Sequence, residues 1–172
     1  AEAPDAVILA AGGLRDTLQV EGDGSAPVID MESFMFTEMG VNVLIYGSNA
    51  QAFDAALWLT VHKKHVTMIT PNTAAEMDMQ QSQHAMRMMT TALYSLGFSA
   101  WPQASLKSVN QNKAVILTET GVEMEIACDA IVNAADMLPN TSLLEGLTVA
   151  ETYAVGDCAN PFNIAKAIHA GN

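Results

Sequence analysis

The residues whose types and spacing best suit ligand binding form a short glycine loop, Gly47-Ser48-Asn49-Ala50-Gln51-Ala52. The apolar run 41–46 before this loop predicts a buried strand, and the spacing of apolar residues over 50–62 predicts a helix. A strand, a tight glycine turn and a helix N-terminus together bind the pyrophosphate of a dinucleotide through backbone N–H groups. The loop therefore predicts a dinucleotide site.

The loop departs from the G-x-G-x-x-G pattern at its second and third glycines, which are Asn49 and Ala52. Gly47 still allows the tight turn, and Ala52 adds a single methyl where helix and strand pack closely. Asn49 is the serious change, because its side chain is expected where the backbone should approach the pyrophosphate. Asparagine tolerates positive φ, so the turn can survive, and the N–H groups from Ala50 onward still favour an anion. Two interpretations stay open: a working site, and a degenerate domain that keeps only the fold.

The position that selects between NAD and NADP is also altered. An acid at the end of the second strand, about 20 residues past the loop, normally binds the ribose hydroxyls of NAD. The second strand here ends at Thr70, and the next acidic residues in the sequence, Glu76 and Asp78, lie too far beyond the strand end to replace the ribose-binding acid. No Lys or Arg lies between His65 and Arg87 to pair with a 2′-phosphate. The sequence therefore favours NAD over NADP.

The remaining patterns predict an α/β fold, with a Rossmann-like parallel sheet, helices on both faces and a three-stranded antiparallel β-meander. Strands are expected at 5–13, 41–46, 66–70, 129–136 and 153–158, and the meander at 100–109, 114–119 and 122–127. Helices are expected at 30–36 with Asp30 as N-cap, 50–62, 79–96 with Met86, Met89, Leu93 and Leu96 on one face, and 163–170. The strand at 5–13 reads as buried on both faces.

A weak internal repeat links two of these strands. The seven-residue stretches Asp5–Ala11 and Asp129–Ala135 share an Asp-Ala, two β-branched residues, one variable position and an Ala-Ala. The repeat predicts two similar sheets, each finished by the same kind of strand.

Composition narrows the class of protein. Half of the residues are hydrophobic and 15% are charged, which predicts a compact fold. The net charge of −12 opposes binding to nucleic acid or anionic lipid. No apolar run approaches the ~20 residues of a membrane helix, and no signal peptide is recognisable. Cys128 and Cys158 have neither C-x-x-C nor zinc spacing, which predicts reduced thiols, a cytoplasmic protein and no metal site.

Several of these motifs, taken in order, resemble one family. The order of motifs is similar to that of the flavoproteins with two dinucleotide-binding domains. The motifs are an A-T-G-like strand end (Ala10-Ala11-Gly12), the glycine loop, the meander, a second such strand end (Ala134-Ala135-Asp136), Pro139-Asn140 and Gly156-Asp157. The tail, Tyr153 to Pro161 followed by Ala167-Ile168-His169-Ala170-Gly171, resembles the NADH:flavin oxidoreductases of the 2,4-dienoyl-CoA reductase, 2-enoate reductase and trimethylamine dehydrogenase type. This tail is the most specific part of the resemblance.

The resemblance implies a fragment of a longer polypeptide. In that family an N-terminal barrel carries FMN and an iron–sulfur cluster, and a following domain binds FAD, or only ADP, with the NAD(P)H domain inserted within it. By this likeness, residues 1–37 and 138–172 are parts of the FAD-type domain, and 38–137 form the NAD(P)-binding domain. The expected partners are the missing barrel and the missing FAD-domain half, whose own glycine fingerprint would precede Ala1.

The resemblance also implies roles for residues. The loop residues 47–52, Thr70, and the strand ends at Gly12, Ala134 and Ala135 would contact cofactors, and Gly156-Asp157 would contact the ribityl or phosphate part of FAD. For Asp157 the alternative is a structural role, as an N-cap or in the turn into the tail. The region would present NAD(P)H for hydride transfer to FAD, and the cofactors would carry the chemistry. No catalytic residue is expected, so the isolated chain should be inactive. The alternative, by analogy with members similar to trimethylamine dehydrogenase, is a scaffold without a dinucleotide.

Overall fold

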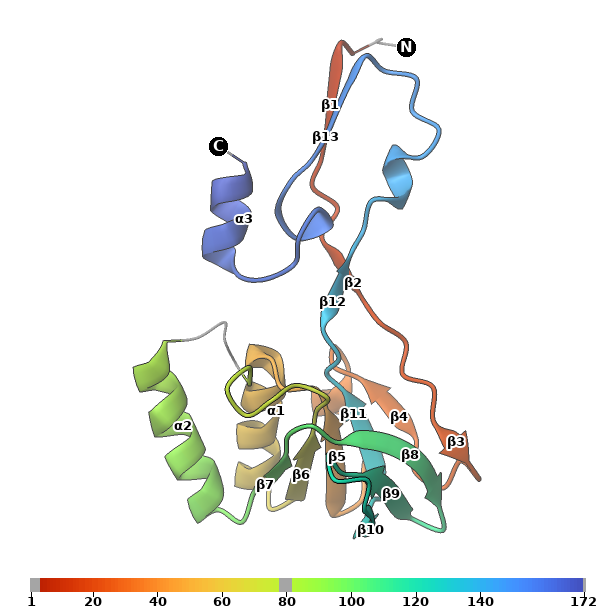
Figure 1. Cartoon of the computed structure of the whole chain (residues 1–172), viewed down its shortest axis with the longest axis vertical. Helices are drawn as coiled ribbons and strands as arrows, with labels where there is room; N and C mark the ends of the chain where they lie inside the picture. The colour runs from red at the N-terminus through yellow and green to blue at the C-terminus, as the bar shows by residue number, and fades with distance from the viewer. Residues whose placement is uncertain (1–3, 78–81, 172) are drawn as a thin grey trace. The chain divides into compact units, whose positions relative to one another are not determined.

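The structure is a computed structural model that describes residues 4–77 and 82–171. The chain divides into two compact units, each of which is described by itself (Figure 1). The larger unit comprises residues 17–135 and holds the glycine loop. The smaller unit comprises residues 1–16 and 136–172.

The larger unit is built on a parallel sheet, as the sequence predicted. Its strand order is β4-β11-β5-β6-β7, and every neighbouring pair is parallel. The strands are β4 (Val28–Asp30), β5 (Asn42–Tyr46), β6 (His65–Ile69), β7 (Ser99–Trp101) and β11 (Ala130–Asn133). With the crossover helix between β5 and β6, this is the Rossmann-like arrangement, in which ligands bind at the carboxyl ends of the strands.

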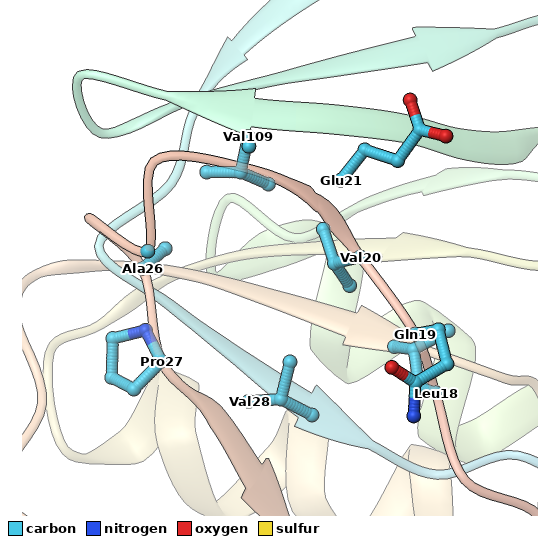
Figure 2. Close-up of a pocket in the computed structure, with 10 residues that line it drawn as sticks. Leu18, Gln19, Val20, Glu21, Ala26, Pro27, Val28 and Val109 are labelled. Atoms are coloured by element: carbon cyan, nitrogen blue, oxygen red, sulfur yellow. The ribbon is translucent and has the colours of Figure 1, made fainter.

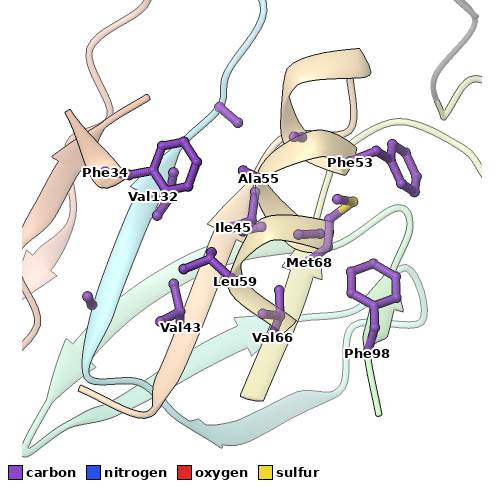
Figure 3. Close-up of a cluster of buried hydrophobic side chains, with 14 of the residues drawn as sticks. Phe34, Val43, Ile45, Phe53, Ala55, Leu59, Val66, Met68, Phe98 and Val132 are labelled. Atoms are coloured by element: carbon purple, nitrogen blue, oxygen red, sulfur yellow. The ribbon is translucent and has the colours of Figure 1, made fainter. Parts of the chain in front are cut away.

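One face of this sheet is covered by α1 (Ala50–Val61) and α2 (Gln83–Ser95) (Figure 1). Figure 3 shows the core that they close, in which Phe53, Ala55 and Leu59 of α1 lie over the strand residues Ile45 and Val66. The central strands are apolar because the parallel sheet is covered on both faces, so that their side chains are shielded from water. Among the described residues of this unit, both α-helices lie on this one face, although helices had been expected on both.

The other face is covered by the predicted meander. It consists of β8 (Ser105–Asn110), β9 (Lys113–Leu117) and β10 (Glu123–Ala127), paired antiparallel, and the short β3 (Glu21–Gly22) joins β8. Val109 and Ile116 of the meander pack on Leu44, Ile69 and Ile131 of the parallel sheet. The expected strand at 100–109 is wrong as one element, because the chain turns at Gln103 (φ 51°) and divides it into β7 and β8.

Two helix predictions need correction. Residues 30–36 do not form one helix capped by Asp30, because Asp30 ends β4 and only the 3₁₀ turn η1 (Phe34–Phe36) follows. Helix α2 is capped by the Ser82 side chain, while its predicted start at 79 lies outside the described residues. Met86, Met89 and Leu93 do pack on the core, but Leu96 is 49% exposed, since the helix has already ended.

The smaller unit contains two short ladders. Strand β1 (Ala6–Leu9) pairs in parallel with β13 (Glu151–Ala154), and β2 (Gly13–Arg15) pairs antiparallel with β12 (Met137–Pro139). The 3₁₀ turns η2 (Ser142–Leu144) and η3 (Gly156–Cys158) and the helix α3 (Ile164–Ala170) complete it. The strand expected at 153–158 is wrong beyond Ala154, because η3 begins at Gly156 (φ 65°) after the extended residue Val155. The strand expected at 5–13 is wrong as a buried element, because it is two strands and Ile8 is 69% exposed.

The internal repeat is a structural one. Strand β1 begins one residue after Asp5, and β11 begins one residue after Asp129, and both are four residues long. The strands β2 and β12, which follow the repeat, also begin at equivalent places, at Gly13 and Met137. They pair with each other, so that Leu14 faces its own counterpart, Leu138.

No helix in the described ranges is both long and apolar enough to cross a membrane.

Candidate dinucleotide-binding site

Gly47 fixes the loop between two strand ends. It follows β5 with φ 123°, and its N–H donates to the carbonyl of Ile69 (2.9 Å) at the end of β6. A Cβ at this position would lie 2.0 Å from the carbonyl oxygen of Ala134, just after β11. Both the φ value and the close approach require glycine, so this residue specifies the path of the chain into α1.

Asn49 is the N-cap of α1. Its Oδ1 accepts a hydrogen bond from the N–H of Ala52 (3.1 Å), and its Nδ2 donates to the carbonyl of Ala134 (2.9 Å). The backbone is extended (φ −78°, ψ 177°), and only 9% of the residue is exposed. Asparagine is among the best N-caps because its side chain satisfies an N–H that the helix leaves unpaired. The turn therefore uses no positive φ at Asn49, and the side chain is folded into the protein.

The first turn of α1 is accessible to solvent at its first two residues and buried from Ala52 onward. Ala50 is partly exposed, Gln51 is exposed, and the methyl of Ala52 is fully buried in the core. The core thus accommodates the residue that replaces the third glycine. A ligand could reach the backbone at 50–51.

Thr70 lies inside the protein, at the end of β6. It is fully buried, and its Oγ1 lies 3.0 Å from the Oγ of Ser48, which is also buried. Thr70 Oγ1 also accepts a hydrogen bond from the N–H of Asn72 (3.2 Å), and Asn72 Nδ2 donates to Ser48 Oγ (3.3 Å). Thr70 therefore supports the loop from within.

Asn72, which the sequence pattern did not single out, lies beside the predicted loop. It is partly exposed, and it hydrogen-bonds to the loop from just past the strand end where the ribose-binding acid is expected. A polar side chain two residues beyond that strand end was the available signal.

The structure brings Ala134 and Ala135 to the same edge of the sheet. The carbonyl of Ala134 is shared by the Gly47 contact and the Asn49 hydrogen bond, and the Ala135 N–H donates to Asn133 Oδ1 (3.1 Å). The predicted residues of the larger unit thus form one cluster. It comprises Gly47, Ser48, Asn49, Ala50, Gln51, Ala52, Thr70, Ala134 and Ala135.

The other predicted residues, Gly12, Gly156 and Asp157, belong to the smaller unit. Gly12 (φ 72°) and Gly156 (φ 65°) both follow the ends of the paired strands β1 and β13. Asp157 is exposed, and no hydrogen bond to its carboxylate occurs within the described ranges. The capping interpretation of Asp157 is wrong for α3, because the side chain of Asn163 caps that helix through the N–H of Lys166 (3.0 Å).

Both cysteines are buried in the described structure. Burial, its largest cause, raises the pKa of the Cys128 thiol to about 11, so this sulfur stays protonated at neutral pH. The Cys158 Sγ is buried and donates to the carbonyl of Asn140 (2.8 Å). No group of three or more potential metal ligands occurs in the described part of the chain.

The larger unit also has a shallow hollow of about 270 Å³ beside β3 and β4 (Figure 2). It is lined largely by the segment 18–28, with Val109 of β8 on another side. Glu21 is its one carboxylate. None of the lining residues belongs to the predicted nucleotide site.

A parallel sheet that carries a glycine loop and a helix N-terminus at its carboxyl edge defines a dinucleotide-binding α/β domain. The sequence pattern of one family, described as pyridine nucleotide-disulphide oxidoreductase, matches residues 2–171, and this chain belongs to that family. It is thus a flavin- and pyridine-nucleotide-binding oxidoreductase region. It has no C-x-x-C motif. No curated protein matches the chain.

Solved structures share this fold. The chain resembles 2-naphthoyl-CoA reductase (TM-score 0.79, 22% identity, 98% of this chain and 26% of that chain). It also resembles histamine dehydrogenase from Rhizobium sp. 4-9 (0.79, 19%, 97% and 29%). A third similar structure is the bacillithiol disulfide reductase Bdr from Staphylococcus aureus (0.72, 16%, 95% and 59%). The chain therefore spans less than a third of the length of the first two proteins.

Proposed function

We propose that this chain is the pyridine-nucleotide region of a multidomain flavin and iron–sulfur oxidoreductase of the enoate or dienoyl-CoA reductase type. In this role it presents NAD(P)H for hydride transfer to FAD. The observation that carries the proposal is the inward fold of the Asn49 side chain. Because that side chain bonds to Ala52 and Ala134, it leaves the accessible start of α1 open to a pyrophosphate.

The chain's own residues would bind and orient the nucleotide. With a net charge of −12 the protein repels phosphate at long range, so binding must come from backbone N–H groups at close range. Asn49 already uses the N–H of Ala52, so the site offers fewer donors than an intact fingerprint. We expect weaker binding for this reason. NAD is favoured over NADP, since the stretch between His65 and Arg87 has no cation for a 2′-phosphate.

The smaller unit supports the partner proposal. Strand β11 has neighbours on both edges, β4 and β5, whereas its repeat counterpart β1 pairs only with β13 in the described structure. We place the missing half of the FAD domain on the other edge of β1, with its glycine loop against Ala10 as Gly47 lies against Ala134. The exposed carboxylate of Asp157 can accept hydrogen bonds from the ribityl hydroxyls of FAD. FMN, the iron–sulfur cluster and the substrate would belong to the barrel, consistent with the greater length of 2-naphthoyl-CoA reductase.

A second function is favoured by the same Asn49. A helix that is capped by its own chain is stable without a ligand, so this domain could serve as a scaffold and bind no dinucleotide. The two functions predict different binding. Both proposed functions include a cytoplasmic location. The two buried cysteines, which form no disulfide, are consistent with that location.

The test is a calorimetric titration of the protein with NADH, NADPH and ADP. Nucleotide presentation predicts binding of NADH tighter than about 1 mM, which is about −4 kcal/mol. It also predicts tighter binding in the Asn49→Gly variant. The matched control is Asn163→Gly, which alters the cap of α3 in the smaller unit. If all three nucleotides bind more weakly than millimolar in both the wild type and Asn49→Gly, the scaffold function is correct.

A further inference from the structure

Residues 33–39, which contain η1, leave two neighbouring apolar side chains in water. Phe34 is buried, and its ring packs edge-on against Trp58 of α1, with the ring centroids 5.4 Å apart. The next two residues, Met35 and Phe36, are 48% and 86% exposed. Folding gains nothing from an apolar side chain that stays in water, and contiguous exposed apolar residues mark contact surfaces in soluble proteins. This η1 segment is therefore a candidate contact surface.

The turn between α1 and β6, the basic turn, carries four basic residues in a row, His62-Lys63-Lys64-His65. Lys63 is exposed, and it is the one lysine of the described larger unit whose side chain has no polar partner. Lys107 and Lys113 pair with glutamates of the meander, and Lys64 donates to a backbone carbonyl. In a protein with a net charge of −12, an unpaired lysine attracts a carboxylate from another molecule.

The η1 segment and the basic turn lie side by side on the larger unit. Lys64 Nζ donates to the carbonyl of Met39, the last residue of the η1 segment (2.8 Å). The ring of His62 stacks on Trp58 (centroids 3.9 Å apart), against which the η1 segment also packs. Glu38 is exposed, and no ion pair to its carboxylate occurs among the described residues. One surface thus holds an acidic half and a basic half that touch without neutralising each other.

Exposed apolar residues also border the basic turn. Val61, which ends α1, is 59% exposed. Val41, whose carbonyl accepts from the N–H of His65 (2.8 Å), is 50% exposed. Each half of the surface therefore combines apolar side chains with charge, and the two halves differ in the sign of that charge.

We propose that this surface binds the same surface of a second copy of the chain, so that the protein forms a two-fold symmetric dimer. A two-fold axis places the η1 segment of each copy against the basic turn of the other, because each contact in such an interface occurs twice. Phe36 then packs against Val61, and Glu38 pairs with Lys63. A second copy supplies both halves, whereas one half would repel a uniformly acidic or a uniformly basic partner.

None of these residues belongs to the predicted nucleotide site, so dimerisation and nucleotide binding are independent. The glycine loop follows the end of β5, whereas the basic turn precedes the start of β6. Because β5 and β6 are parallel, the loop and the basic turn lie at opposite edges of the sheet. A dimer formed through the basic turn therefore leaves the glycine loop uncovered by that contact.

Sedimentation velocity tests the dimer at protein concentrations up to about 100 μM, because a contact between short segments favours a micromolar dissociation constant. The mean mass of the wild type should rise with concentration toward twice the monomer mass. Phe36→Ser should raise the dissociation constant at least about tenfold, because it removes the most exposed apolar contact. Circular dichroism should show an unchanged fold, since this side chain is already in water. The matched control, which should dimerise like the wild type, is Val122→Ser, 55% exposed between β9 and β10.

Charge reversal tests the proposed ion pair. Glu38→Lys and Lys63→Glu should each raise the dissociation constant about tenfold, because like charges then meet at both equivalent contacts. An equimolar mixture of these two variants should dimerise like the wild type, since every such contact in the mixed dimer joins a lysine to a glutamate. A loss of folding in either variant could not be restored by mixing.

Three results would overturn the proposal. The first is a wild type that stays monomeric up to about 100 μM. The second is a dimer that persists unchanged in Phe36→Ser and in both charge variants, because another surface then joins the copies. The third is a mixture of the charge variants that stays as weakly associated as each variant alone, which removes the pairing of Glu38 with Lys63. Each leaves the NADH titration of the wild type unaffected, so the dimer and nucleotide presentation can fail separately.

Discussion

Two copies of one short sequence pattern have opposite surroundings in this protein. Strand β11 of the second copy is buried along its whole length, whereas Ile8 of β1 in the first copy is largely exposed. The pattern makes both segments strands. Their burial differs because β11 lies between β4 and β5 in a sheet that has helices on one face and the meander on the other. The described neighbour of β1 is β13 alone.

The two strand ends differ in the same way. After β11, the carbonyl of Ala134 meets Gly47 and accepts from Asn49. After β1, Ala10 and Ala11 are exposed. A strand end becomes part of a nucleotide site only when a second segment brings a glycine loop against it, so the comparison can be tested at each of these contacts.

The largest effect is expected for Gly47→Ala. The backbone of Gly47 has a φ of 123°, and the added Cβ would lie 2.0 Å from the carbonyl oxygen of Ala134. Together these two features should lower the free energy of unfolding by about 3 kcal/mol. Urea unfolding followed by tryptophan fluorescence measures this, since Trp58 and Trp101 both lie in the larger unit. Gly12→Ala is the control in the smaller unit. With positive φ but no atom within 4 Å of the added Cβ, it should cost about 1 kcal/mol by circular dichroism.

The second prediction compares equivalent residues of the repeat. Val132→Ala removes buried methyl groups and should cost about 2 kcal/mol. Ile8→Ala, at the matching position of β1, should cost less than about 0.5 kcal/mol because this side chain is already in water. Equal losses in the two denaturation curves would mean that β1 is covered in solution.

The third prediction compares two helix caps. Asn49→Ala removes the cap of α1 and leaves the buried carbonyl of Ala134 without its side-chain donor, at a cost of about 1.5 kcal/mol. Asn163→Ala removes only the exposed cap of α3 and should cost about 0.5 kcal/mol. Thermal melting followed by circular dichroism orders the two variants. A larger loss for Asn163 would contradict the role of Asn49 as the bond between loop and sheet.

The smallest effect concerns the aspartates that open each repeat. The hydrogen bond from the Asn42 N–H (2.8 Å) is the largest cause that lowers the pKa of Asp129, outweighing the opposing effect of burial. A lowered pKa in the folded state means that the stabilisation is present above the unfolded value, near 4, and is lost as the pH falls through the folded value.

Asp129→Asn should therefore flatten the loss of stability measured by urea unfolding between about pH 5 and pH 3. Its repeat counterpart, Asp5, has no hydrogen bond in the described structure, so Asp5→Asn controls for the loss of one carboxylate. A wild-type pH profile in Asp129→Asn would refute the role of this carboxylate.

The sequence by itself determined the elements around the loop. The apolar run, Gly47 and the helical spacing predicted β5, the turn and α1, because these signals are local and each follows from the conformation of a few residues. The meander and the parallel sheet followed from alternation and from the crossover length. The stretch 5–13 was also predicted as a strand, but its division into β1 and β2 and the neighbours of each could not be read from its own residues.

Only the tertiary structure decided what the polar residues of the loop do. The sequence placed the Asn49 side chain in the path of the pyrophosphate, whereas the fold brings Ala134 within its reach and turns it inward. The fold likewise buries Thr70 and leaves Asn72 accessible beside Ser48. A hydrogen bond between residues more than 20 positions apart depends on sheet register and crossover packing, and neither leaves a local pattern in the chain.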